Sequence, residues 1–210
     1  MEDGHVATRQ PRSAKGRARR AQIVQAASAL FGSRGYRAVT LRDIAEAAGI
    51  SHQNLLYYFP TKDELLQAVL EERDAATSHL FDDVKSLAEW IAIALQVSRA
   101  NAEAPGLLAS FTITTAEATD PEHPAHQYYQ NRYELFESHV APLFEAARRA
   151  GSVRADIDPR MATRLLLAIQ DGLQLQWLFD KSAVDMHGML AHALQLFQPY
   201  DEAGGDGPQN

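Results

Sequence analysis

Hydrophobic side chains recur at helical spacing in the stretch from residue 40 to residue 62, and that pattern predicts two short helices. Thr40 and Asp43 have the spacing of a capping box that starts the first helix. Gly49 ends it where a left-handed residue is needed, and Ser51 caps the second. The turn is too short for antiparallel packing, so we expect a helix-turn-helix. The apolar face of the first helix is formed by Leu41, Ile44, Ala45 and Ala48.

The second of these helices has two faces of different chemistry. Leu55, Tyr58 and Phe59 cluster on one side, which we expect to pack against the first helix. Glutamine and asparagine pair bidentately with adenine in the major groove, so the other side is suited to reading DNA bases. An ordinary solvated helix face carries the same residue types, so the pattern alone leaves both interpretations open. The outward side holds His52, Gln53, Asn54, Leu56 and Tyr57.

Helical periodicity continues through the rest of the chain and predicts an all-α fold. The β-branched run 111–115 favours a strand locally, but no partner strand is evident, so we predict a helix. Pro142 is expected to kink its helix. Gly172 lies mid-helix, where glycine costs about 1 kcal/mol against alanine, and a close helix approach would explain it. Met189 is expected to face inward in the last helix. The further helices are predicted at about 18–35, 61–78, 82–102, 106–119, 125–150, 159–180 and 184–197.

Changes in composition divide the chain into four parts. Residues 1–17 lack periodicity and predict a flexible basic arm, whose arginines could reach phosphates or a minor groove or could simply aid solubility. Residues 18–64 predict the helix-turn-helix domain, and residues 65–198 a helical regulatory and dimerisation domain. Residues 199–210 predict a disordered tail.

Charge is distributed unevenly along the 210 residues, whose net charge is −7. Residues 1–62 hold ten Lys and Arg against four Asp and Glu, a net charge of +6. The remaining residues hold ten against 23, a net charge of −13. DNA binding needs only a local positive field within a Debye length, so the basic N-terminal part favours contact with phosphates. A non-specific nucleoid-type binder would be expected to spread basic charge more widely.

Residues 18–70, about a quarter of the chain, resemble the DNA-binding segment of TetR-type transcriptional regulators. The resemblance rests on Gly35-Tyr36, Thr40, Ala48-Gly49-Ile50-Ser51, Tyr57-Tyr58-Phe59-Pro60 and Lys62-Asp63-Glu64-Leu65-Leu66. Many members have tyrosine where this chain has Leu56, which affects one expected DNA contact. The resemblance implies a three-helix DNA-binding domain. Its contacts to double-stranded DNA are expected from Thr40, Arg42, Ser51, His52, Gln53, Asn54, Tyr57, Tyr58 and Lys62.

The resemblance also implies that the second domain dimerises and holds a small-molecule pocket among its middle helices. We expect the homodimer to form through residues 160–180 and 184–197, and a charge at Leu173 to disrupt it. Polar groups placed among apolar ones are candidate pocket residues, although each could instead be a satisfied core or interface residue. The candidate ligand-binding set is Trp90, Phe111, Thr112, Thr115, Tyr129, Tyr133, Gln170, Gln174 and Trp177.

Motifs for catalysis and metal binding are missing from the sequence. There is no cysteine, which excludes disulfides and thiolate metal sites, and no nucleophile elbow, phosphate-binding glycine loop or His-Glu-x-x-His. Glu122, His123 and His126 lie in a proline-rich segment that we interpret as a solvated loop rather than a metal site. No apolar run approaches the ~18 residues of a membrane span, and no secretory signal is recognisable. We therefore expect a cytoplasmic protein that is not an enzyme and needs no cofactor.

These patterns together predict a ligand-responsive DNA-binding regulator. We expect a repressor that binds a palindromic operator as a homodimer and is released by a small apolar or aromatic molecule. The alternative is a DNA-binding regulator, or a nucleoid-type binder, without a small-molecule effector.

Overall fold

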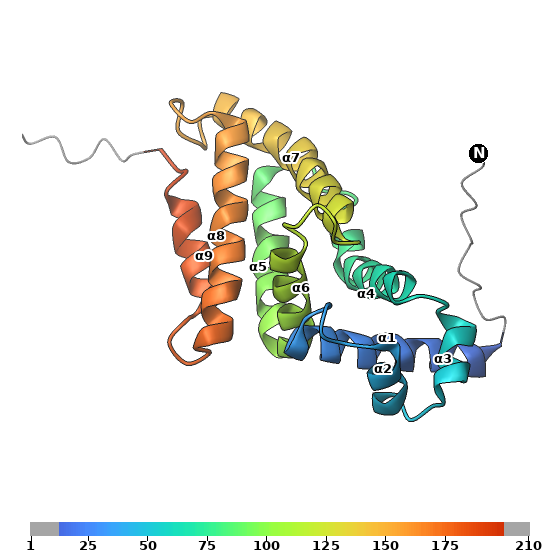
Figure 1. The fold of residues 1–210 in the computed structure, drawn as a ribbon. Coiled ribbons are helices and arrows are strands. Elements are labelled where there is room, and N and C mark those ends of the chain that lie inside the picture. Colours follow the sequence, from blue (N-terminus) through green and yellow to red (C-terminus); the bar gives the residue numbers. More distant parts are fainter. Residues whose placement is uncertain (1–12, 200–210) are drawn as a thin grey trace, which may run out of the picture. The chain divides into compact units, whose positions relative to one another are not determined.

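The computed structural model describes residues 13–199, which form nine α-helices and no strand (Figure 1). The all-α prediction is confirmed. Within the described residues, one compact unit comprises 13–79 and 101–130, and a second comprises 80–100 and 131–199. The elements are α1 (Ala14–Arg34), α2 (Leu41–Ala47), α3 (His52–Tyr58), α4 (Lys62–Thr77), the 3-10 turn η1 (Ser78–Leu80), α5 (Leu87–Glu103), α6 (Pro105–Glu117), α7 (His126–Arg149), α8 (Pro159–Phe179) and α9 (Met186–Gln195).

The first unit is built on α1, which packs against α2, α4 and α6. The approach of α6 to α1 is close at Gly32, where a Cβ would lie only 2.7 Å from the backbone nitrogen of Ser110 and 2.9 Å from the carbonyl oxygen of Gly106. Only glycine fits there without a shift of the backbone. The core of this unit is formed by buried residues of these helices, of α3 with its C-cap and of the start of α7, among them Ile23, Phe31, Ile44, Leu55, Phe59, Leu65, Val69, Phe111 and Tyr129.

The second unit packs α5, the later part of α7, α8 and α9 around its own core. Asp158 caps α8 by accepting a hydrogen bond from the Met161 amide at 2.8 Å, and Pro159 follows at the first helical position. Helices α8 and α9 lie side by side (Figure 1). The core includes Leu87, Trp90, Ala94, Val140, Phe144, Ala162, Leu166, Leu190, Leu194 and Phe197.

The structure corrects several local predictions. Helix α1 begins at Ala14, with the Ser13 hydroxyl accepting a hydrogen bond from the Gly16 amide at 3.1 Å, so residues 14–17 are helical and not part of a flexible arm. The predicted arm and tail at 1–12 and 200–210 lie outside the described residues. Met189 is 43% exposed, so the prediction that it faces inward is wrong.

The start of α5 also differs from its prediction. The helix begins at Leu87 instead of near residue 82, because the Ser86 hydroxyl accepts a hydrogen bond from the Glu89 amide at 3.2 Å and caps it there. Among the helices in the range 13–199, none is long and apolar enough to cross a membrane.

Candidate DNA-binding and ligand-binding sites

Helix α2 starts at a complete capping box. The Thr40 hydroxyl accepts a hydrogen bond from the Asp43 amide at 3.2 Å, and the Thr40 amide donates to the Asp43 carboxylate at 2.8 Å. Hydrogen bonds from the Thr40 side chain and backbone, with the nearby Arg34, hold the pKa of Asp43 below its ordinary value. Thr40 therefore fixes the first turn of α2, whatever contact it makes with DNA.

The turn between α2 and α3 is held in place by α1. Gly49 has a φ of +63°, the left-handed conformation predicted for it. The Gln22 side-chain amide donates to the Ala48 carbonyl at 3.0 Å, and the Gln22 amide oxygen accepts from Arg19 at 2.8 Å. Gln22 could not be identified from the sequence, because it carries no motif signal and is recognised only from its contact with the turn.

Helix α3 presents a polar surface while its other side enters the core. Leu55 and Phe59 are fully buried, and the Ser51 hydroxyl caps the helix by accepting from the Asn54 amide at 3.2 Å. Tyr57 is 66% exposed and stands edge-on to the half-buried Tyr58. The side chains left accessible on α3 include Gln53, Asn54 and, in part, His52, while Arg42 is exposed on α2.

Lys62, a predicted DNA contact, is engaged mainly inside the protein. Its ammonium group donates to the carbonyl oxygens of Tyr36 and Val39, both at 3.0 Å, and lies 4.1 Å from the Tyr36 ring centroid. Burial lowers the pKa of Lys62. Two of its three ammonium hydrogens thus fasten the α1–α2 turn to the start of α4.

Four of the predicted ligand-binding residues lie in the first unit. The Phe111 carbonyl accepts hydrogen bonds from the hydroxyls of Thr115 at 2.8 Å and Tyr129 at 3.2 Å, so both of these groups are satisfied within the protein. The guanidinium of Arg73 stacks 3.2 Å from the Phe111 ring centroid. Within the described residues, the buried hydroxyl of Thr112 has no hydrogen-bond partner.

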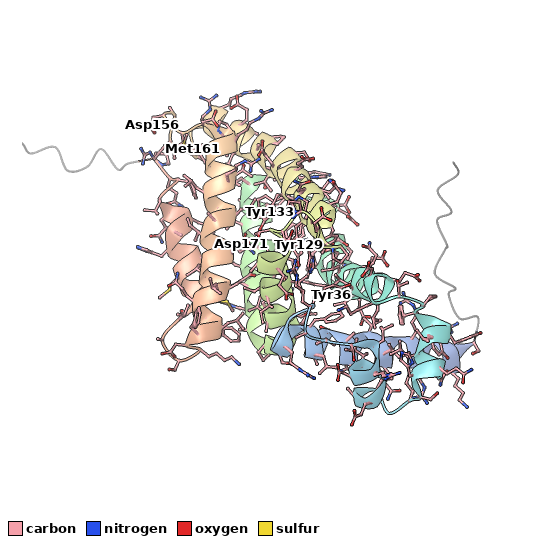
Figure 2. All side chains as sticks on the ribbon, viewed as in Figure 1. Tyr36, Tyr129, Tyr133, Asp156, Met161 and Asp171 are labelled. Atoms are coloured by element: carbon pink, nitrogen blue, oxygen red, sulfur yellow. The ribbon has the colours of Figure 1, made fainter. Side chains whose placement is uncertain are left out.

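The other five lie in the second unit. The Tyr133 hydroxyl of α7 donates to the Asp171 carboxylate of α8 at 2.9 Å (Figure 2). Trp90 and Trp177 are buried, whereas Gln170 is partly exposed. The side-chain oxygen of buried Gln174 has no hydrogen-bond partner in the part of the chain that the structure describes.

A cleft of about 610 Å³ opens between α7 and α8 in the second unit, but its lining is charged. Glu137, on one wall, pairs with Arg164, on the other, at 2.7 Å. None of the nine predicted ligand-binding residues lines this cleft. Its walls are formed by Glu134, Glu137, Ser138, Ala141, Pro142, Glu145, Asp158, Pro159, Arg160 and Arg164.

An apolar stripe runs along the exposed side of α8. Its members recur at alternating intervals of four and three residues, the spacing at which two helices pack along a shared seam. They are Met161, Leu165, Ala168, Gly172, Leu175 and Phe179, of which Phe179 is 84% exposed. Leu173, predicted as an interface position, is partly buried and packs against the core of the second unit. Met189 on α9 and Leu196, its C-cap residue, add exposed apolar surface.

Two family models match the chain. The model described as "Bacterial regulatory proteins, tetR family" matches residues 23–69, and "BetI-type transcriptional repressor, C-terminal" matches residues 91–198. The transcriptional repressor KstR2 of Rhodococcus jostii is 33% identical over 164 residues, 70% of this chain and 74% of its own length. The regulator TtgR of Pseudomonas putida is 29% identical over 177 residues, 80% and 84% of the two chains.

Solved structures have the same fold. A SmeT–triclosan complex superposes with a TM-score of 0.71 at 19% identity, covering 92% of this chain and 99% of that one. A regulator from Saccharomonospora viridis in complex with choline has a TM-score of 0.67 at 23% identity, covering 84% and 94%.

Proposed function

Because the chain belongs to the TetR family of bacterial transcriptional regulators, we propose that it binds a palindromic operator as a homodimer and releases it when a small apolar or aromatic molecule binds. The matched models and relatives are DNA-binding transcriptional regulators rather than enzymes. The proposed site of action is the cytoplasm, where bacterial DNA lies.

The polar surface of α3 is the observation that carries the DNA-binding part of the proposal. A capped helix N-terminus, a turn fixed by Gln22 and two fully buried anchors hold Gln53 and Asn54 outward. Amides in this position can read adenine edges, and each good bidentate contact discriminates by about 1–3 kcal/mol. Thr40, Arg42, Tyr57 and the remaining Lys62 hydrogen would contact phosphates, which position the protein without reading sequence.

Selection of bound fragments from a random DNA pool tests this assignment. We expect an imperfect palindrome with half-sites about one helical turn apart. Gln53→Ala should relax the preference at the bases it contacts, while Glu72→Ala, an exposed carboxylate on α4, serves as the control. Enrichment of no sequence over the starting pool would refute specific recognition.

The apolar stripe of α8 supports a second copy of the chain as its partner. A monomeric surface seldom shows so regular a series of apolar positions, and a two-fold dimer would bury the stripe against itself. The exposed Met189 and Leu196 of α9 can extend the interface. Leu175→Glu should yield monomers in sedimentation equilibrium, and a dimer that survives this charge would place the interface elsewhere.

The buried oxygen of Gln174 supports the effector part of the proposal. A buried polar atom without a partner costs about 1–3 kcal/mol, which a ligand hydroxyl or amine could recover. The effector we propose is therefore an apolar or aromatic molecule that carries one such donor for the Gln174 oxygen; Trp90, Tyr133 and Trp177 lie in the same unit.

A thermal-shift screen of aromatic alcohols and amines, followed by operator release, tests the effector. Gln174→Leu should weaken the response of a responsive compound and leave operator binding without ligand unchanged. Absence of any compound that both stabilises the protein and releases DNA would favour the alternative of a regulator without a small-molecule effector. The charged lining of the described cleft is the observation behind that alternative.

A further inference from the structure

Tyr36, in the turn between α1 and α2 and labelled in Figure 2, has contacts with several other parts of the first unit. It is buried, and its ring contacts Phe31 at 5.4 Å and His123 at 4.9 Å between centroids. Every polar group of the residue is also bonded: its amide, its carbonyl and its hydroxyl each have a partner from another helix or its flanking loop.

The start of α4 holds Tyr36 from one side. The Tyr36 hydroxyl donates to the carboxylate of Asp63, and burial together with this hydrogen bond raises the pKa of Tyr36. Lys62 binds the Tyr36 carbonyl and also the Val39 carbonyl, immediately before Thr40 caps α2. The position of the turn is therefore coupled to the position at which α2 begins.

The end of α6 holds the same turn from the other side. The Glu117 carboxylate accepts a hydrogen bond from the Tyr36 amide at 2.7 Å. Arg37, the next residue, pairs with Asp120 in the loop after α6. Gly35 has a φ of +77°, and a Cβ there would lie 2.7 Å from a Glu117 oxygen, so the carboxylate sits directly on the backbone of the turn.

Glu117 and Asp120 lie outside the DNA-binding segment at residues 18–70, yet they hold the turn that leads into α2. Residues 117–123 come from a part of the chain about 80 residues further on, and the two carboxylates bind consecutive residues of the turn. The interior packing of the three-helix domain is already supplied by Phe31, Ile44, Leu55 and Phe59. The polar contacts instead fix where the turn, and with it α2, stands relative to α6.

We propose that Glu117 and Asp120 are positioning residues for DNA binding, which set the orientation of α2 and α3 by holding the turn at Tyr36 and Arg37. This inference rests on the proposed function as an operator-binding regulator. When the contacts are lost, α2 is free to shift. Because operator binding requires a fixed position of the recognition helix α3, the affinity of the protein for the operator falls more than its affinity for random DNA.

The first test uses Glu117. Glu117→Ala removes the acceptor of the Tyr36 amide, whereas Glu117→Gln keeps an oxygen at the same place. We expect Glu117→Ala to lower operator affinity about tenfold, the usual size of such couplings, with circular dichroism unchanged. Glu117→Gln should recover most of that loss, and Glu72→Ala should have no effect. Equal losses on operator and random DNA, or no rescue by glutamine, would overturn the proposal.

The second test reverses the ion pair and guards against misfolding of the first variants. Arg37→Asp and Asp120→Arg, made singly, should each lower the ratio of operator to random-DNA affinity, and the double variant should restore it. The ratio cancels the general effect of added or removed charge on DNA binding. Failure of the double variant to recover would show that Arg37 acts on DNA alone and would overturn the role of Asp120. If wild-type protein shows no operator preference, the proposed function itself fails.

Discussion

Gly172 offers a test in which folding and dimerisation should respond in opposite directions. It lies in the middle of α8 on the apolar stripe, and a Cβ added to it would meet no atom within 4 Å apart from those of its chain neighbours and of the nearby α8 backbone. Nothing within the described protomer therefore requires glycine at this position. We predict that Gly172→Ala stabilises the folded protomer and weakens the dimer.

The size of both effects follows from the geometry. Alanine in place of a helical glycine gains about 1 kcal/mol, and the free space around the new methyl group leaves that gain intact. In a two-fold dimer with α8 packed on its copy, two methyl groups enter one close crossing, and overpacking of this kind costs about 1–3 kcal/mol. The dimer dissociation constant should thus rise about 5- to 150-fold.

The two effects are measured separately. Urea unfolding in a Leu175→Glu background, where the protein is expected to be monomeric, reports the gain in folding free energy. Sedimentation equilibrium in the wild-type background reports the dissociation constant. Gly106→Ala is the matched control, since a Cβ there also meets no atom within 4 Å beyond its chain neighbours and its own helix backbone, and the residue lies off the stripe.

Two results would contradict the reasoning. An unchanged dissociation constant would mean that Gly172 is not at a helix crossing between copies. If Gly172→Ala does not raise the free energy of unfolding of the Leu175→Glu protein, glycine has a conformational role within the protomer that its surroundings do not reveal.

Three further predictions concern the first unit. Gln22→Leu should lower the free energy of unfolding by about 1 kcal/mol and reduce operator affinity, because the Ala48 carbonyl loses its hydrogen bond. Urea titration measures the first effect and filter binding the second. An unaffected operator affinity would contradict a role of Gln22 in fixing the turn. Burial lowers the pKa of His123 below its ordinary 6.5, so the unfolded chain takes up a proton more readily than the folded one. The contribution of neutral His123 to the free energy of unfolding should be fully present above about pH 6.5. It should be lost as the pH falls toward the pKa of the folded state. Thermal unfolding of His123→Asn should show a flatter slope in that window, and an identical slope would refute the assignment. Arg42→Gln should reduce the slope of log affinity against log salt by about 1, as loss of a phosphate contact does, and an unchanged slope would exclude that contact.

The DNA-binding segment could be predicted closely from sequence because its signals are local. Thr40, Gly49 and Ser51 act within a few residues of their own positions, and each has the conformation or hydrogen bond predicted. The family predicted from this motif is confirmed by the matched family models.

Contacts distant in sequence could not be predicted in the same way. His123 was interpreted as part of a solvated loop, but it is only 4% exposed because the loop after α6 folds over Tyr36. Lys62 has the expected place in the motif, while its partners, the carbonyls of Tyr36 and Val39, are visible only once α1 and α4 are packed. The four-and-three spacing of the apolar stripe on α8 is visible in the sequence. Because α8 also carries apolar residues on its inward face, the sequence does not show which of the two faces is exposed.

The discontinuous first unit limits how this regulator can be cut and recombined. Residues 13–79 alone complete neither the core of this unit nor the contacts of the Tyr36 turn, because Phe111, Glu117 and the following residues up to 130, which include the start of α7, belong to the same unit. A chimera joined just after α4 would leave behind the partners of Gly32 and Tyr36, whereas a graft that also carries residues 101–130 keeps them. For the same reason, the first unit, which carries α2 and α3, cannot complete its fold during synthesis until residue 130 has left the ribosome. By that time more than half of the chain has been made.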